Sequence, residues 1–428
     1  MKEFQATNAL NLQVRSGSRP FWTTALATAG LISLGSVALA DESPVSSLVS
    51  GTTIGGAVET SAQWKPSTGS TMATRFANTA PDHYNGFNLE YVELRLEKPL
   101  DDAQWSAGYK AEMWFGQDAS WLPGSLGPNL AIKQAYVTLR APVGNGLDFK
   151  IGQFDTIIGY ETLSAYANPN FSRNLGNWLE PYSHTGILSS YKVTDWLGLN
   201  AGIADGQYSV MNQKQPWAQV PYGFPGVPGP AAGSAPKGNG KLTYLGSVVL
   251  TAPESFGFLQ GGTLTGSIVD GGQTTLPNSM NYYVGLTIPT PIKQVTLGAS
   301  YDYVTSSYAA NSYAQSVAGY ISWQITEKLK FNTRVEYANA GRTPGGVWIL
   351  PIPGNPLTGV PGEADGYVAG SPEKLFAVTG TLEYALWANV VTRLETIWDH
   401  NLIGTGISGP FNGSNNAVLL LANIAYKF

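Results

Sequence analysis

Residues 104–115 read QWSAGYKAEMWF, and this stretch decides the fold class. Its apolar side chains occupy every second position: Trp105, Ala107, Tyr109, Ala111, Met113 and Phe115. The positions between them are mainly polar and include Lys110 and Glu112. Because successive side chains of a strand point to opposite faces, the stretch predicts a β-strand with one apolar and one polar face.

The same period of two recurs from residue 54 to the end of the chain. Sixteen segments show it: 54–64, 88–98, 104–115, 130–140, 147–153, 183–193, 196–204, 241–252, 258–269, 280–288, 293–304, 313–325, 329–338, 374–386, 388–399 and 415–428. Short connections, such as 99–103 and 326–328, alternate with long ones, such as 205–240 and 339–373. This sorting is typical of an all-β, transmembrane antiparallel β-barrel of about sixteen strands, with short periplasmic turns and long extracellular loops. We expect that barrel over residues 41–428.

The barrel hypothesis also predicts where charged side chains lie. Those on the apolar phase would face lipid, where Arg or Lys at the midplane costs about 2–4 kcal/mol, so we expect no charge there. The opposite phase would line the lumen, with these candidates: Glu93, Arg95, Lys110, Glu112, Arg140, Lys150, Lys330, Arg334, Glu336, Arg393 and Glu395. The same phase also carries Glu59, Glu97, Asp148, Lys192, Asp302, Glu383, Asp399 and Lys427. Nine basic and ten acidic residues give the wall no strong bias, which disfavours a dedicated phosphate pore or a purely acidic cation filter.

The two ends of the sequence indicate export. Arg15 and Arg19 precede an apolar stretch that closes on an A-x-A pattern at Ala38 and Ala40, which predicts a signal peptide over residues 1–40. A single N-terminal anchor helix is the alternative. At the other end, alternation continues to Tyr426 and Phe428, and this resembles the C-terminal signal by which the barrel-assembly machinery recognises outer-membrane proteins. We expect the mature protein in the cell outer membrane of a Gram-negative-type bacterium, in contact with its lipid.

Composition excludes several other classes of protein. Charged residues are 12% of the 428, about half the ~25% of soluble domains, while aromatic residues reach 11%. Beyond residue 40 no run of about 20 apolar residues occurs, as a helical membrane protein would need. Residues 1–40 hold three basic residues and one acidic residue, so the rest of the chain carries 21 basic and 28 acidic residues, a net charge of −7. That charge disfavours nucleic acid as a partner, and the absence of cysteine excludes cysteine-ligated zinc.

A more specific pattern lies at residues 149–191, FKIGQFDTIIGYETLSAYANPNFSRNLGNWLEPYSHTGILSSY. Its order of G-x-F, G-Y-E, N-P-x-F-S-R and P-x-x-H-T-G resembles the OmpL-like family of outer-membrane β-barrel porins. Residues 88–118, with E-K-P-L and F-G-Q-D, are similar to the same family. The resemblance covers about 75 residues and implies an outer-membrane porin, but says little about its solute.

Residues 154–182 are the candidate for a loop that folds into the lumen and narrows it. The segment is long, follows a strand, and brings charges of both signs: the candidate constriction residues are Asp155, Glu161, Arg173 and Glu180, with His184 just beyond. Charges of opposite sign across a constriction would set a transverse field and a size limit. The alternative is that Asn168-Pro169 and Phe171-Ser172-Arg173 only shape and anchor the loop, with Arg173 paired to a carboxylate.

The sequence gives little support for a metal site, a cofactor site or an enzyme active site. His83, His184 and His400 lack metal-ligand spacing, and no cofactor motif is present. A serine hydrolase would need a Ser–His pair, but Ser183 and His184 are neighbours on a strand and point apart. We therefore expect no enzyme, but a porin for passive diffusion of small hydrophilic solutes or ions. A substrate-specific channel and a structural or adhesive barrel are alternatives, and assembly as a homotrimer and the role of loops 205–240 and 339–373 stay open.

Overall fold

A computed structural model describes residues 51–66, 85–122, 124–127, 129–206, 242–271, 279–306, 313–340, 373–402 and 415–428. All of them belong to one compact unit. The predicted signal peptide with Ala38 and Ala40, the residue His83, and most of loops 205–240 and 339–373 lie outside the described residues.

The described chain consists almost entirely of β-strands. They are β1 (Thr53–Trp64), β2 (Gly86–Lys98), β3 (Ser106–Phe115), β4 (Ser125–Gly127), β5 (Leu130–Ala141), β6 (Leu147–Asp155), β7 (Ser183–Lys192), β8 (Leu197–Ala204), β9 (Thr243–Thr251), β10 (Thr263–Gly271), β11 (Ser279–Pro289), β12 (Val295–Ser306), β13 (Tyr313–Gln324), β14 (Leu329–Ala340), β15 (Glu373–Trp387), β16 (Val390–Asn401) and β17 (Asn416–Lys427). Four short 3₁₀ helices lie in connections: η2 (Gln117–Trp121), η3 (Ala165–Ala167), η4 (Gly176–Trp178) and η6 (Glu254–Leu259). No helix in these ranges has the length and hydropathy needed to span a bilayer.

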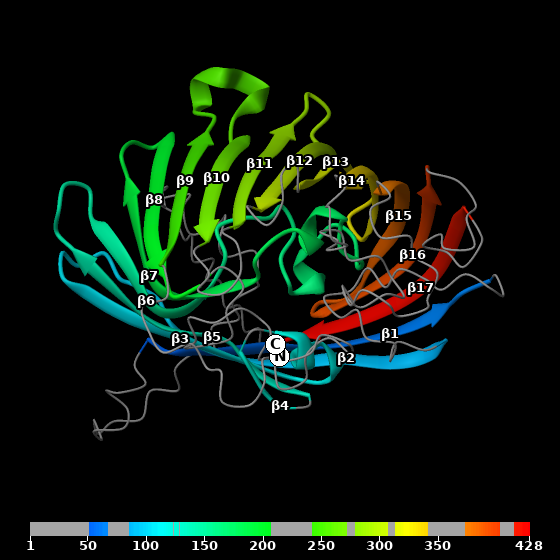
Figure 1. Cartoon of the computed structure of the whole chain (residues 1–428), viewed down its shortest axis with the longest axis horizontal. Coiled ribbons are helices and arrows are strands. Elements are labelled where there is room, and N and C mark those ends of the chain that lie inside the picture. The colour runs from blue at the N-terminus through cyan, green and yellow to red at the C-terminus, as the bar shows by residue number, and fades with distance from the viewer. Residues whose placement is uncertain are drawn as a thin grey trace, which may run out of the picture. The chain divides into compact units, whose positions relative to one another are not determined.

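Sixteen of these strands close into an antiparallel barrel, which confirms the predicted number and class (Figure 1). Each strand pairs with its neighbour in the sequence, except that β4 pairs only with β5 beside the wall, so β3 joins β5 directly. The last strand, β17, pairs with β1 from Ala57 opposite Lys427 to Trp64 opposite Leu420. Closure leaves no sheet edge with unpaired N–H and C=O groups, as a hydrocarbon environment requires.

The predicted segments match the strands closely, with one clear difference. The segment 258–269 was expected to be extended throughout, but β10 begins only at Thr263. Residues 254–259 form η6, where Gly257 has φ of 60°, and Gly261 also has a positive φ of 79°. These two glycines turn the chain twice within one connection, so the apolar Phe258 and Leu259 lie in a turn although they continue the alternation.

The outer face of the barrel is apolar, as the period-two pattern predicts. Exposed large side chains occur on nearly every wall strand, for example Leu94, Val248, Val317 and Leu394. We call the end of the barrel where the connections between strands are short the short-turn end. Trp387 and Phe258 are exposed at it, where an aromatic girdle of a membrane barrel would lie.

The expectation of an outer face free of charge is wrong at five positions of the predicted segments. Lys98 and Lys374 lie at strand ends, where the outward phase reaches the rim of the barrel, and Lys293 lies in the turn before β12. Glu90 and Lys133 are different, because they lie well inside their strands yet are buried within the barrel. A β-bulge explains each: the register of β1 and β2 skips Glu90, and that of β3 and β5 skips Lys133. An extra residue in one strand reverses the inside–outside alternation beyond it.

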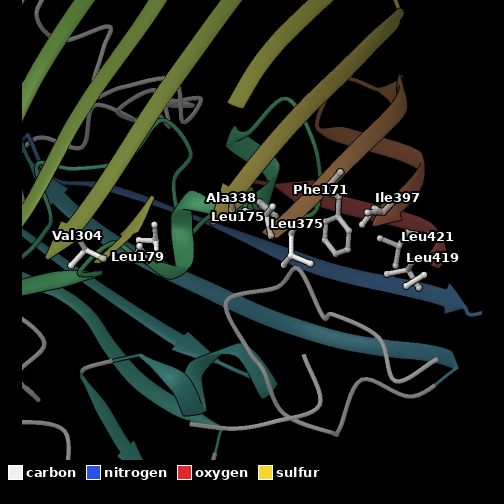
Figure 2. Packing of buried hydrophobic residues seen from close by; sticks show 13 residues of the cluster. Phe171, Leu175, Leu179, Val304, Ala338, Leu375, Ile397, Leu419 and Leu421 are labelled. Atoms are coloured by element: carbon white, nitrogen blue, oxygen red, sulfur yellow. The ribbon is translucent and has the colours of Figure 1, made fainter. Parts of the chain in front are cut away.

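The inner face carries an apolar strip as well as the expected polar wall. Ala338, Leu375, Ile397, Leu419 and Leu421 point inward from β14 to β17 and are buried, as Figure 2 shows. They pack against Phe171, Leu175 and Leu179 of the connection between β6 and β7. The lumen therefore has a small hydrophobic core of its own, formed between the wall and a segment inside it.

Candidate functional site

The connection between β6 and β7 runs inside the barrel, and we call residues 156–182 the inserted segment (Figure 1). It contains η3 and η4, and its contacts reach the inner wall on several sides. The carbonyl of Ile157 accepts a hydrogen bond from Ser267 of β10, whereas the N–H of Leu175 donates to Glu336 of β14. The segment therefore crosses the lumen, and it is shorter than the predicted range 154–182, because Phe154 and Asp155 still belong to β6.

Arg334 of β14 is the central anchor of the inserted segment. Its guanidinium is fully buried and pairs with Glu161 of the segment at 2.8 Å and with Glu336 of its own strand at 2.7 Å. It also donates to the carbonyl oxygens of Ser172 at 2.8 Å and Arg173 at 2.9 Å. A planar guanidinium with five donors suits such a site, because it can satisfy two carboxylates and two backbone oxygens at once.

A second anchor lies one strand pair further round the barrel. Glu395 of β16 accepts hydrogen bonds from the backbone N–H groups of Phe171, at 2.7 Å, and Ser172, at 3.0 Å. Arg393 of the same strand donates to three carbonyl oxygens of the segment, between Ala165 and Asn168. Two charged wall residues thus satisfy backbone groups of an irregular segment that would otherwise be buried without partners.

Strand β2, three strands beyond β16 round the barrel, holds the segment too. Glu93 of β2 accepts hydrogen bonds from the Tyr166 hydroxyl, at 3.0 and 3.1 Å, and from the Ser164 hydroxyl at 3.4 Å. Burial, and then the negative charge of Glu93, raises the pKa of Tyr166, so the phenol stays protonated and donates. The inserted segment is therefore tied to β2 as well as to β14 and β16.

The five predicted constriction residues occupy different environments. Asp155 is the most accessible, with 37% of its side chain exposed, and pairs with Lys133 at 2.8 Å. Glu161 and Arg173 are buried. In the described part of the chain Arg173 donates to the carbonyl oxygens of Phe171 and Leu163 and forms no ion pair with a carboxylate. His184 is buried, and its Nε2 lies 3.0 Å from the Thr156 hydroxyl, at the start of the segment.

Glu180, the fifth residue, forms a carboxyl pair with Asp302 of β12. Both side chains are buried, and both oxygens of Asp302 lack a hydrogen-bond donor. Burial raises the pKa of Glu180 well above its usual range, and the neighbouring Asp302 raises it further. A protonated Glu180 can then donate to the Asp302 carboxylate, so one proton serves both groups.

The predicted lumen-lining residues all face inward, but they differ in access to water. Glu93, Arg95, Glu112, Arg334, Glu336, Arg393 and Glu395 are buried, and the half-buried ones are Lys110, Arg140, Lys150 and Lys330. Most of the carboxylates expected to line a channel therefore serve to anchor side chains or the inserted segment.

Two inward-facing residues were missed because the bulges hide their orientation. Lys133 bridges Glu112 at 3.1 Å and Asp155 at 2.8 Å, and Lys110 reaches Glu112 from the other side at 3.1 Å. Glu90 accepts a hydrogen bond from Ser61 of β1. Each of the two bulged residues has a polar or aromatic neighbour, Gln134 and Tyr91, that also points inward, and two such residues in succession are the sequence signal of the break.

Comparison with protein families identifies the family of this barrel. A family model described as "Putative beta-barrel porin-2, OmpL-like" matches residues 51–428. The chain belongs to this OmpL-like porin family. The match spans every described strand, and it confirms the resemblance drawn from residues 88–118 and 149–191. Comparison with curated proteins finds no match.

Solved structures share the fold of this OmpL-like porin at low sequence identity. Pseudomonas putida OprB has a TM-score of 0.57 at 11% identity, covering 90% of this chain and 96% of its own. An anion-selective porin from Comamonas acidovorans has a TM-score of 0.54 at 10% identity, covering 88% and 99%. The trimer form of OmpT from Vibrio cholerae has a TM-score of 0.51 at 11% identity, covering 88% and 99%. The family and these neighbours support an outer-membrane channel of the porin type.

Proposed function

We propose that the protein is an outer-membrane porin through which small hydrophilic solutes or ions diffuse passively, in a lumen narrowed by the inserted segment. The observation that carries this proposal is the anchoring of residues 156–182 to the inner wall by Arg334, Arg393, Glu395 and Glu93. A barrel of sixteen strands is wide enough for an aqueous channel, whereas one of eight is filled by its own side chains. A fixed segment inside such a barrel sets the width of what remains.

The arrangement of polar groups favours passage over catalysis. His184 is hydrogen-bonded to Thr156, and the Ser189 hydroxyl donates to the carbonyl of Ala201. In the described contacts neither Ser183 nor Ser189, two serines of the same strand, is a partner of His184, so the pairing that a serine nucleophile requires is not formed. We infer that the protein is not an enzyme.

Planar-bilayer recording of the refolded protein tests the porin proposal. Discrete single-channel openings, with a conductance that rises linearly with salt, are the expected result. Conductance blocked in a saturable way by one solute would favour a substrate-specific channel instead. A folded barrel without openings would refute the proposal and favour a structural or adhesive barrel.

Location and assembly follow from the same proposal. The family supports the outer membrane, and we propose that the protein arrives there after cleavage at Ala38 and Ala40, with Tyr426 and Phe428 as the signal read by the assembly machinery. A homotrimer is proposed because one neighbour, Vibrio cholerae OmpT, was solved in a trimer form. Chemical cross-linking of native outer membranes should then give a ladder that ends at three copies.

A further inference from the structure

Charged side chains inside the barrel are sorted by height along the strands. The first five residues of each strand, counted from the short-turn end, carry eight inward-facing basic residues and three acidic ones, Glu97, Asp148 and Glu383. The net charge of this zone is therefore +5. Summing over the whole wall hides the excess, because its ten basic and twelve acidic inward-facing residues nearly cancel.

The basic residues of this zone fall into two groups. Three have carboxylate partners at the same end: Arg140 with Asp148, Arg393 with Glu383, and Lys192 with Asp195 of the following turn.

The other five are Arg95, Lys110, Lys150, Lys330 and Lys427. Arg95 and Lys110 bridge to carboxylates deeper in the barrel, Glu93 and Glu112. Lys150 and Lys427 lie over aromatic rings, Tyr136 at 5.3 Å and Tyr166 at 5.7 Å.

The rest of the strand length shows the opposite sign. Beyond the fifth residue, nine inward-facing positions of the described strands are acidic and two, Lys133 and Arg334, are basic. Several of these carboxylates already have structural partners: Glu93, Glu336 and Glu395 hold the inserted segment, while Glu112 and Asp155 hold Lys133.

The four remaining carboxylates, Glu59, Glu90, Asp302 and Asp399, are all at most 3% exposed.

Access to water decides which of the two zones a permeating ion meets. Glu336 and Glu395 are 1% and 3% exposed, whereas Lys110, Lys150, Lys330 and Lys427 are half-buried. A narrow passage with low-dielectric walls concentrates the field of the accessible charges, and buried, paired carboxylates contribute far less to it. Rings of Lys and Arg are the side chains by which pores favour anions.

We infer that this porin prefers small anions, selected by the basic zone at the short-turn end formed around Lys110, Lys150, Lys330 and Lys427. The inference rests on the proposed function and adds the substrate class to it. The acidic zone holds the inserted segment in place, and the basic zone sets the sign of the ion that passes.

The reversal potential of the full chain in a KCl gradient at low salt tests the inference. We expect a chloride-to-potassium permeability ratio above one, falling towards one as added salt screens the lysines. The triple variant Lys110→Gln, Lys150→Gln and Lys330→Gln lowers the charge of the zone from +5 to +2, and its ratio should fall.

A matched pair of single variants compares the effect of an inward-facing lysine with that of an outward-facing one. Lys330→Gln should lower the ratio, whereas Lys98→Gln, the same change at the same end but on the outward phase of β2, should leave it unchanged. Heat-modifiable migration on gels shows that each variant is folded. A conducting channel with a potassium preference, or equal effects of Lys98→Gln and Lys330→Gln, would overturn the inference alone. Folded protein that never conducts would overturn the porin proposal and this inference together.

Discussion

Replacing Arg334 by alanine should detach the inserted segment without opening the barrel wall. The variant leaves Glu161 and Glu336 buried with no guanidinium between them and removes the donors to the carbonyl oxygens of Ser172 and Arg173. Removing one partner of a buried ion pair costs about 3–5 kcal/mol, because the other charge remains uncompensated. At 1.4 kcal/mol per tenfold, the population with a detached segment should rise by a factor between about 10² and 10⁴.

Limited proteolysis of the refolded protein measures that population, since cleavage follows the open fraction when opening and closing are fast. Cleavage within residues 156–182 should accelerate in Arg334→Ala, and single-channel conductance should rise as the lumen widens. The effect should be smaller at low pH, because burial already raises the pKa of Glu161 and a protonated Glu161 needs no cationic partner.

Arg140→Ala is the control for a lost arginine. Arg140 pairs with Asp148 at 2.6 Å, but their side chains are 28% and 32% exposed, so the loss should cost only about 0–1 kcal/mol. If Arg334→Ala leaves the cleavage rate and the conductance unchanged, Arg334 does not anchor the inserted segment.

Three further changes test the same segment. Phe171→Ala removes its largest apolar contact with the wall and should destabilise the inserted state by about 3–5 kcal/mol, seen as faster cleavage of the segment; an unchanged rate would contradict the core in Figure 2. Deletion of residues 156–178 should raise single-channel conductance, and an unchanged value would remove the constriction from the mechanism. The pKa of Glu180 is raised by burial, so its contribution to stability is complete below its ordinary value of about 4.5 and is lost as the pH rises through the raised value. Glu180→Gln supplies an amide donor to Asp302 at every pH, and cleavage of the segment should then lose the acceleration at high pH that the unaltered chain shows.

Strict alternation predicted the wall of the barrel because lipid on one side and a polar interior on the other leave little freedom to each position. It failed where the backbone departs from a period of two. The orientation of Glu90 and Lys133 follows from the register across the sheet, and the only sign of it in the sequence is a second polar or aromatic residue beside each. The prediction of a strand at Phe258 was wrong for a similar reason, since glycines with positive φ turn the chain before β10 begins.

The location of the inserted segment was predictable from its length and place, but its chemistry was not. Its charges suggested groups facing a channel, whereas Glu161 and Arg173 are buried and hold the segment together. Which charges meet water depends on contacts between β6–β7 and strands more than 150 residues later, such as Glu161 with Arg334. A hint was present in the run Leu419, Leu420 and Leu421, where apolar residues occupy both phases of a strand and one of them must point inward.

The seam between β1 and β17 makes the barrel depend on its final residue. The backbones of Phe428 and Gly56 exchange two hydrogen bonds, of 2.9 and 3.0 Å, across more than 370 positions of sequence. No other strand pair of the wall joins residues so far apart, so this pairing carries the largest loop-closure entropy and should form late. A chain cut short before β17 would expose the edges of β1 and β16 together, and two such incomplete chains could pair through them. Joining the two ends and opening a short turn elsewhere should turn the slowest contact into a local one, so a circular permutant would fold faster while keeping the same wall.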